Sequence, residues 1–143
     1  MLQIRDATPA DAAAIAALLG DLGYPAPAAD IPGRLAAVAR APGRVLVADD
    51  GGEVVGVASV TRLTLLHLAE PAALLSALVV RPDRRARGVG HALVEAVARH
   101  AGELGCATLE LTSRDDRHAA HRFYRELGFE SGSRMFVRQM SHA

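Results

Sequence analysis

Apolar and polar positions recur with two different periods along this chain, and the periods predict its elements. The opening residues LQIRDA alternate at every second position, which is typical of a half-buried strand. Behind them, TPAD places Thr8 as an N-cap, Pro9 at the first helical position and Asp11 three residues after the cap. This start predicts a helix running to about Leu22, and a second helix is predicted from Ile31 to Arg40.

A β-hairpin is the clearest local pattern in the chain. Two β-rich runs, Arg44–Ala48 and Glu53–Val60, flank DDGG, whose Asp-Gly is typical of a tight hairpin turn. The next stretch, LTLLHLAEPAA, reads as a strand end followed by a loop. His67 and Glu70 in that loop are candidates for an acceptor pocket, although an ordinary surface-loop role explains them better.

The middle of the chain predicts a buried strand followed by a long helix. LLSALVV, residues 74–80, is nearly continuously apolar, as a strand buried on both faces should be. Beyond Val89, apolar residues recur at three- and four-residue spacing up to Gly105, which predicts a helix with one face in the core. The predicted core positions are Leu93, Val94, Val97, Ala101 and Leu104.

The last third of the chain predicts a strand, a helix and two closing strands. ATLELTS is the strand, and DRHAAHRFYRELGF is the helix, stopped by Gly128 in the C-cap position. FESGS and MFVRQM read as the closing strands. The predicted order is therefore β-α-α-β-β-β-α-β-α-β-β, which indicates one α/β domain over residues 1–143.

Composition narrows the class of protein. Half of the residues are apolar, yet no segment reaches the roughly 18 uninterrupted apolar residues of a membrane span. Asp6 and Asp11 precede the first apolar run, which is unlike a secretory signal, so we expect a cytoplasmic protein with no membrane partner. Cys106 is the single cysteine, and we interpret it as a small buried hydrophobe.

The charged residues exclude several chemistries. Every positive side chain is an arginine, so neither a Schiff-base lysine nor a P-loop is available. The formal net charge is zero, although the arginines are concentrated in the second half of the chain. A neutral chain with five Phe and Tyr residues and no Trp lacks the basic surface and stacking platform of a nucleic-acid-binding module.

An arginine-rich segment followed by Gly-Val-Gly predicts an anion site. Four of the residues in Arg81–Arg87 are arginines, and the segment stands between the buried strand and the long helix. A helix N-terminus offers unpaired N–H groups, Gly88 and Gly90 allow close backbone approach, and guanidinium groups match phosphate oxygens. A dinucleotide fingerprint is excluded because Leu93 occupies its third glycine position.

Two motifs carry a resemblance to a known family. LVVRPDRRARGVGHALVEAVARHA resembles the acetyl-CoA-binding segment of the GNAT superfamily of N-acetyltransferases, whose loop is Arg/Gln-x-x-Gly-x-Gly/Ala. AHRFYRELGFE is similar to that family's late helix-and-strand segment. The resemblance covers essentially the whole chain, and it implies an α/β (α+β) GNAT fold. That fold has a central mixed, mostly antiparallel sheet of six to seven strands flanked by about four helices.

The resemblance also implies how acetyl-CoA, the acetyl donor, is bound. Backbone amides from Arg85 to Gly90 would hold its pyrophosphate, and the pantetheine arm would lie along the strand Leu78–Val80, beside TLELT. Where family members often have an asparagine seven residues before the tyrosine of FYRELGF, this chain has Arg117, so that contact to the pantetheine is either lost or replaced by Ser113. The implied acetyl-CoA-binding residues are Leu78, Val79, Val80, Arg85, Ala86, Arg87, Gly88, Val89, Gly90, His91, Ser113 and Tyr124.

The implied reaction is direct attack of an amine on the thioester. The oxyanion donor would be the backbone N–H of Leu78 or Val79, and Tyr124 would be the acid that protonates the leaving thiolate. Two other roles for Tyr124 stay open: its hydroxyl could simply orient the sulfur, or the residue could be a core aromatic with its hydroxyl at the surface. The residue that acts as the general base for the amine is not decided by the sequence. Glu110 is one candidate, although an outward-facing strand residue explains it equally well, and a water chain through Ser76 is another.

Substrate and assembly are less constrained by the sequence. The motifs look closest to the branch that includes the aminoalkylphosphonate N-acetyltransferases, which implies a small primary amine as acceptor. A non-catalytic acyl-CoA-binding sensor is the alternative, because the family's usual glutamate is missing from LLSALVV. His118 and His121 lack an evident third ligand, so we expect no metal. A homodimer is possible through the two closing strands.

Overall fold

The computed structural model describes residues 1–113, 118–132 and 135–141. The chain divides into two compact units, Met1–Leu111 and Thr112–Ala143, and each is described by itself. The elements of the first unit are β1 (Leu2–Asp6), η1 (Pro9–Asp11), α1 (Ala12–Leu22), η2 (Ala28–Asp30), α2 (Ile31–Arg40), β2 (Gly43–Asp50), β3 (Glu53–Leu63), β4 (Ala72–Val80), η3 (Pro82–Arg84), α3 (Val89–Glu103) and β5 (Thr108–Leu111). The second unit contains α4 (His118–Glu126).

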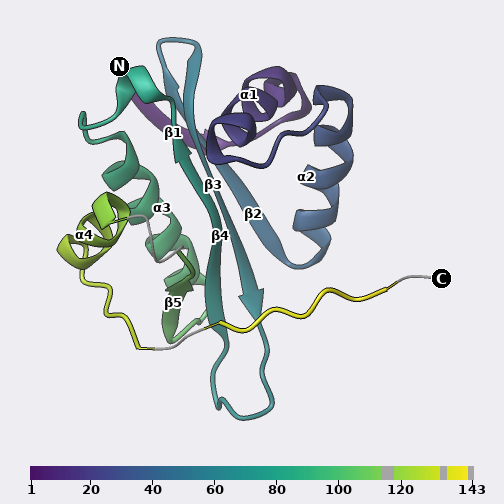
Figure 1. Ribbon diagram of the computed structural model, residues 1–143, viewed down its shortest axis with the longest axis vertical. Coiled ribbons are helices and arrows are strands. Elements are labelled where there is room, and N and C mark those ends of the chain that lie inside the picture. The colour runs from purple at the N-terminus through teal and green to yellow at the C-terminus, as the bar shows by residue number, and fades with distance from the viewer. Residues whose placement is uncertain (114–117, 133–134, 142–143) are drawn as a thin grey trace. The chain divides into compact units, whose positions relative to one another are not determined.

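The first unit is built on one mixed sheet with the order β1-β2-β3-β4-β5 (Figure 1). The first four strands pair antiparallel, and β5 runs parallel to β4. Parallel pairing requires a crossover, which α3 provides between β4 and β5. The resemblance implied six to seven strands, and this prediction is wrong, because the described residues form five.

The two predicted closing strands account for the difference. FESGS and MFVRQM form no strand in residues 129–132 and 135–141. A strand needs a neighbouring strand to accept and donate its backbone hydrogen bonds, and α4 is the one regular element described in the second unit. Four apolar side chains of this segment are exposed, which are Met135, Phe136, Val137 and Met140.

Helices cover both faces of the sheet in the first unit. Figure 1 shows α1 and α2 on one face and α3 on the other. The core under α1 and α2 brings Ile15, Leu18 and Ile31 against Val47, Val57 and Val79. On α3, the predicted core positions Leu93, Val94, Val97 and Ala101 are all buried, while Leu104 is half-buried. Cys106, predicted to be buried, is also only half-buried.

Local signals in the sequence explain how these elements start and turn. The N–H of Thr8 donates to Oδ2 of Asp11 at 2.8 Å, which confirms the predicted cap of the first helix. Asp11 is buried and accepts two further hydrogen bonds from the Arg5 guanidinium, at 2.9 and 3.0 Å. The predicted hairpin is confirmed as β2 and β3, with both turn glycines at positive φ. No helix in the described part of the chain is long and apolar enough to span a membrane.

Candidate active site

Strand β4 changes its pairing in the middle. Along β3, Ser59 pairs with Ala77 while Val60 pairs with Leu75, so Ser76 is an extra residue that forms a β-bulge. The Ser76 hydroxyl donates to the Ser59 carbonyl at 3.2 Å, and its side chain is exposed. The sequence predicted a strand buried on both faces, and Ser76 is the point at which that expectation fails.

Pairing with β5 stops at the same place. Residues Ala72 to Leu75 pair with Thr108 to Leu111, and no pairing with β5 follows the bulge. Within the first unit, the edge of β4 from Ser76 to Val80 therefore carries no strand. Its N–H and C=O groups are the kind that an extended ligand can pair with, as a further strand would.

The segment after β4 forms a loop that ends at the N-terminus of α3. Ala86 has φ 62° and Gly88 has φ 80°, so the backbone turns twice through the left-handed region. The carbonyl of Gly88 accepts the N–H of Ala92 at 3.0 Å. The N–H groups of Val89, Gly90 and His91, in the first turn of the helix, have no carbonyl inside the helix to bond. A Cβ built at Gly88 meets no atom within 4 Å, so the space beside the loop is open.

The four arginines of this segment divide into two pairs. Arg81 and Arg84 are bound to carboxylates of the β2–β3 hairpin and to Asp83. Hydrogen bonds from Arg81 hold the pKa of Asp83 below its usual range. Arg85 and Arg87 are exposed, and neither forms an ion pair with any described residue. Sequence reasoning counted Arg84 among the charges open to an anion, whereas the structure places Asp50 Oδ2 at 2.6 Å from it.

Arg85 links the loop back to β4. Its Nε donates to the carbonyl of Val80 at 3.2 Å, the last residue of the strand. The loop, the first turn of α3 and the unpaired edge of β4 are therefore continuous along the chain. Unpaired amides, two arginines and open space at Gly88 fit a phosphate group, and the edge of β4 fits an extended chain attached to it.

The second unit contains Tyr124, on α4. The ring of Tyr124 is half-buried and meets Phe123 and Phe129 edge-on, with centroids 5.4 and 5.9 Å apart. The N–H of Phe129 donates to the Tyr124 carbonyl at 3.0 Å and Gly128 has φ 91°, which is a Schellman ending of the helix. The predicted stop at Gly128 is thus confirmed. The Leu-Gly-Phe sequence fixes the tyrosine by bonding Phe129 back to its carbonyl.

The remaining candidate residues lie far along the chain from the Arg85–Gly90 loop. Glu110 is exposed on β5 and accepts a hydrogen bond from the Thr108 hydroxyl at 3.1 Å. Ser113 is half-buried in the second unit, and Arg117 lies outside the described residues. His118 and His121 face each other edge-on with ring centroids 6.1 Å apart. Among the residues described, no three metal-ligating side chains come together.

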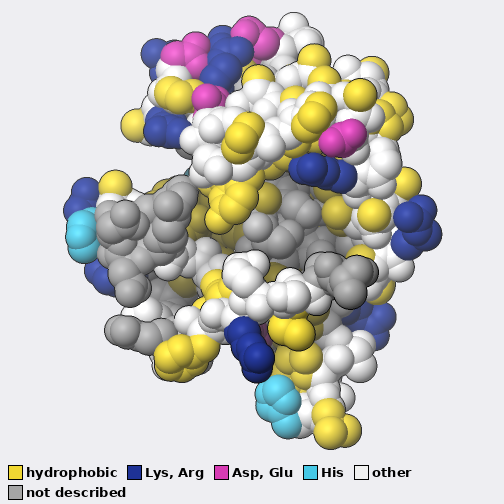
Figure 2. Space-filling view, turned by 45° about the vertical axis from the view of Figure 1, so that its right-hand side comes forward, with side chains coloured by type: hydrophobic (Ala, Val, Ile, Leu, Met, Phe, Trp, Pro, Cys, Tyr) yellow, Lys and Arg dark blue, Asp and Glu magenta, His cyan; other side chains and the backbone are white. Residues whose placement is uncertain are grey.

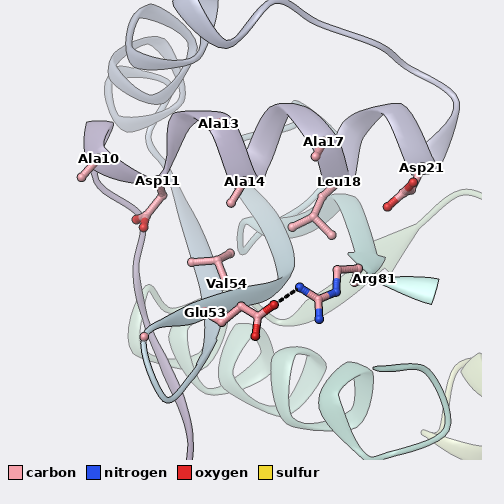
Figure 3. A pocket seen from close by; sticks show the side chains of 11 residues that line it. Ala10, Asp11, Ala13, Ala14, Ala17, Leu18, Asp21, Glu53, Val54 and Arg81 are labelled. Atoms are coloured by element: carbon pink, nitrogen blue, oxygen red, sulfur yellow. Dashed lines mark hydrogen bonds and ion pairs between the residues drawn. The ribbon is translucent and has the colours of Figure 1, made fainter. Parts of the chain in front are cut away.

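A shallow groove lies under α1, with a cavity volume of about 420 Å³ (Figure 3). Alanines of α1 form one side of it, and Val54, Glu53 and Arg81 lie on the opposite side. The groove therefore touches the hairpin and the start of the arginine loop. Sequence reasoning missed it, since its walls come from three segments that are distant in the chain.

Comparison with known proteins decides the family. The sequence model described as the acetyltransferase (GNAT) family matches residues 14–129, most of the chain. This protein belongs to the acetyltransferase (GNAT) family.

Two curated relatives of this GNAT protein are N-acetyltransferases. It is 38% identical over 144 residues to an aminoglycoside N(6')-acetyltransferase type 1 of Stenotrophomonas maltophilia, covering 96% of this chain and 92% of the relative. It is 32% identical over 89 residues to an aminoalkylphosphonate N-acetyltransferase of Salmonella typhimurium, covering 62% of this chain and 58% of that protein. The GNAT protein is accordingly an acetyl-CoA-dependent N-acetyltransferase. Nothing in the comparisons favours the sensor alternative.

Solved structures agree on the fold of the GNAT protein. A transcriptional regulator from Bacillus halodurans is similar with a TM-score of 0.87 and 27% identity, covering 98% of this chain and all of that one. A putative acetyltransferase from Agrobacterium tumefaciens is similar with a TM-score of 0.84 and 26% identity, covering 96% and 99%. The α/β fold with a mixed central sheet and four helices is thus confirmed, with five strands in the described residues.

Proposed function

We propose that this protein transfers the acetyl group of acetyl-CoA to the primary amine of a small molecule by direct attack. The observation that carries the proposal is the continuity of an unpaired strand edge with an amide-rich loop. The edge of Ser76–Val80 offers backbone groups to an extended chain, apart from the Val80 carbonyl that Arg85 binds, and Arg85–Gly90 offers amides and two arginines to its phosphates. Acetyl-CoA has these two parts in the same order.

The loop would hold the pyrophosphate. The amides of Val89, Gly90 and His91 point out of the first turn of α3, where the helix dipole also favours an anion. Arg85 and Arg87 would add guanidinium contacts, with Ala86 and Gly88 shaping the backbone around them. The pantetheine would pair with Leu78, Val79 and Val80, and Ser113 is a further proposed contact.

The edge of β4 would also stabilise the oxyanion. When the amine nitrogen bonds to the thioester carbon, the carbonyl oxygen becomes negative and needs an N–H donor aimed at it. We assign that donor to the backbone of Leu78 or Val79, as the resemblance implies. The C–S bond then breaks, and the electron pair leaves on sulfur.

Two protons must move in this reaction. Tyr124 is the proposed acid that gives its phenolic proton to the departing thiolate, and the amine gives up a proton to a base. Glu110 is the proposed base, with a water chain through Ser76 as the second route. The exposed Glu110 carboxylate and the exposed Ser76 hydroxyl are both open to water, which is compatible with either route.

The acceptor class follows from the named relatives. One acts on an aminoglycoside and the other on an aminoalkylphosphonate, and both are small molecules with primary amines. We propose that residues 1–143 act as a single acetyltransferase domain, since the family match at 14–129 includes parts of both compact units. A homodimer and a cytoplasmic location are proposed with it.

Release of free thiol from acetyl-CoA tests the proposal. The purified protein is mixed with acetyl-CoA and a panel of aminoglycosides, aminoalkylphosphonates, polyamines and amino acids. Thiol release with one class would identify the acceptor. A thermal shift with CoA alone reports binding separately from turnover, because a ligand that binds the folded state raises Tm. Absence of both would refute the proposal.

A further inference from the structure

The β2–β3 hairpin is bound to the start of the arginine loop by a network of ion pairs. Arg84 Nη1 lies 2.6 Å from Asp50 Oδ2, and Arg84 Nη2 lies 3.4 Å from Glu53 Oε2. The second oxygen of Glu53 accepts a hydrogen bond from Arg81 Nη1 (Figure 3). Glu53 thus binds both Arg81 and Arg84, and Asp50, at the other end of the β2–β3 turn, also binds Arg84.

A backbone hydrogen bond joins the same two segments. The N–H of Arg81 donates to the carbonyl of Val55 at 2.8 Å. Val55 is the extra residue of a bulge in β3, because Ala48 pairs with Gly56 and Asp49 pairs with Val54. The N–H of Arg84 in turn donates to the carbonyl of Arg81 at 2.9 Å. Arg81, the N-cap of η3, and Arg84, its last residue, are therefore both fixed through backbone and side chain.

This anchored turn immediately precedes the segment proposed to bind phosphate. Arg85 follows Arg84 directly, and the next three residues contain both left-handed positions, Ala86 and Gly88, and lead to the first turn of α3. Figure 2 shows basic and acidic side chains intermingled at the top of the molecule, the end at which Figure 1 places the β2–β3 turn. Because Arg81 and Arg84 are both held by carboxylates, these two arginines fix the backbone of the turn rather than contact a ligand.

We propose that Glu53 and Asp50 are positioning residues for acetyl-CoA binding. They hold the Arg81–Arg84 turn so that the Arg85–Gly90 loop is already in the conformation that receives the pyrophosphate. A ligand that meets an ordered loop does not have to order it on binding, and its affinity is higher for that reason. This inference rests on the function proposed above and assigns a role to a hairpin outside the binding loop.

Loss of the anchor and loss of the negative charge should change the affinity for CoA in opposite directions, so the positioning role can be distinguished from a simple charge effect. Neutralising Glu53 removes a negative charge close to the loop, and electrostatics alone would then strengthen the binding of an anion. Loss of the anchor would weaken it. At physiological salt the Debye length is about 8 Å, so interactions between exposed charges that lie further apart than this are largely screened. The direction of the change in affinity therefore reports which effect dominates.

The experiment compares Glu53→Gln and Asp50→Asn with Asp6→Asn. Asp6 pairs with Arg44 at 2.5 and 3.0 Å, in an ion pair of similar exposure that lies on β1, away from the loop. The Kd for CoA is measured by calorimetry, and KM and kcat for acetyl-CoA by thiol release with the accepted amine. Amide hydrogen exchange of residues 85–91 is followed without ligand.

The expected result is a rise of about threefold to tenfold in Kd and KM in the two hairpin variants, at unchanged kcat. Exchange in residues 85–91 becomes faster in these two variants, and Asp6→Asn stays within twofold of the wild type in every measurement. Glu53→Asp, which keeps the charge, regains part of the affinity.

Three results would overturn the inference. An unchanged or lowered Kd in Glu53→Gln and Asp50→Asn shows that the hairpin does not position the loop. An equal loss in Asp6→Asn shows a general effect on stability. Failure of the wild-type protein to bind CoA removes the proposed function as well, and this outcome is distinct from the first two, in which the wild type binds.

Discussion

Leu75 pairs with Leu111 at the last position where β4 and β5 are joined, and the next residue of β4 is the bulged Ser76. The end of pairing and the bulge coincide, so β4 has two halves with different partners. The first half is enclosed between two strands. The second half keeps β3 on one side, has no pairing with β5 on its other edge, and leads directly to the loop proposed to bind the phosphates.

Removal of the phenol at Tyr124 should reduce turnover with little effect on cofactor binding. A general acid contributes about 100-fold or more to a rate, so Tyr124→Phe is expected to lower kcat by at least that factor and to leave KM for acetyl-CoA nearly unchanged. Thiol release measures both. Tyr24→Phe is the matched control, because Tyr24 is the second tyrosine of the chain and is exposed. Equal losses in the two variants would argue against an acid role.

Neutral replacements at the unpaired arginines should weaken CoA binding. Arg87→Ala removes an exposed guanidinium without leaving a carboxylate unpaired, and we expect KM for acetyl-CoA to rise about fivefold, or roughly 1 kcal/mol. The wild-type KM should increase with salt more steeply than that of the variant. Arg34→Ala, an exposed arginine on α2, is the control. A KM unchanged in Arg87→Ala would exclude the guanidinium as a phosphate contact.

An added methyl group at Gly88 should cost both stability and affinity. Gly88 has φ 80°, where an alanine is disfavoured by roughly 1 to 2 kcal/mol. Its Cβ would project into open space in the protein alone, so the strain is conformational and the steric conflict appears only with a bound anion. Gly102→Ala is the control, since Gly102 is an ordinary helical position on α3 with room for a Cβ. We expect Gly102→Ala to stabilise the protein slightly. Urea unfolding and CoA titration measure the two effects.

The stability of the first unit should fall in acid through Asp11. Hydrogen bonds from Arg5 hold the pKa of the Asp11 carboxyl below its usual range, helped by the N–H of Thr8. Because the folded pKa is the lower one, this stabilisation is complete above the unfolded pKa of about 4 and is lost as pH falls through the folded value. Asp11→Asn should therefore cost about 1 to 2 kcal/mol at pH 7, and less below pH 4.

Denaturant unfolding at pH 7 and pH 3.5 measures this pH dependence. Asp21→Asn serves as the control, because Asp21 is exposed on α1, the helix that Asp11 caps, and forms no ion pair with a described residue. A penalty for Asp11→Asn that is constant with pH would contradict the assignment.

Periodicity predicted the helices and most of the strands because each rests on local signals. The α3 face is readable from three- and four-residue spacing, and the hairpin from Asp-Gly between two β-rich runs. Gly128 was readable as a helix stop because the left-handed C-cap is a local requirement. The position of the loop before α3 was readable too, since its glycines and the helix start lie within a few residues of each other.

The closing strands were not predictable in the same way. Their sequences were read as strands, but a strand exists only when another strand supplies hydrogen-bond partners, and no local pattern encodes that partner. The same holds for the bulge at Ser76, whose single sequence signal is a hydroxyl residue in an otherwise apolar run.

The sequence by itself determined where the helices and most of the strands lie, that a loop rich in arginine and glycine precedes α3, and that lysine chemistry is excluded, because each depends on neighbouring residues or on composition. Only the tertiary structure decided which arginines of that loop are open to a ligand. Asp50 and Glu53 lie about thirty residues before Arg84 in the chain, and folding of the hairpin beside the end of β4 brings their carboxylates to it. Charges separated in sequence interact through space, so their pairing is a property of the fold.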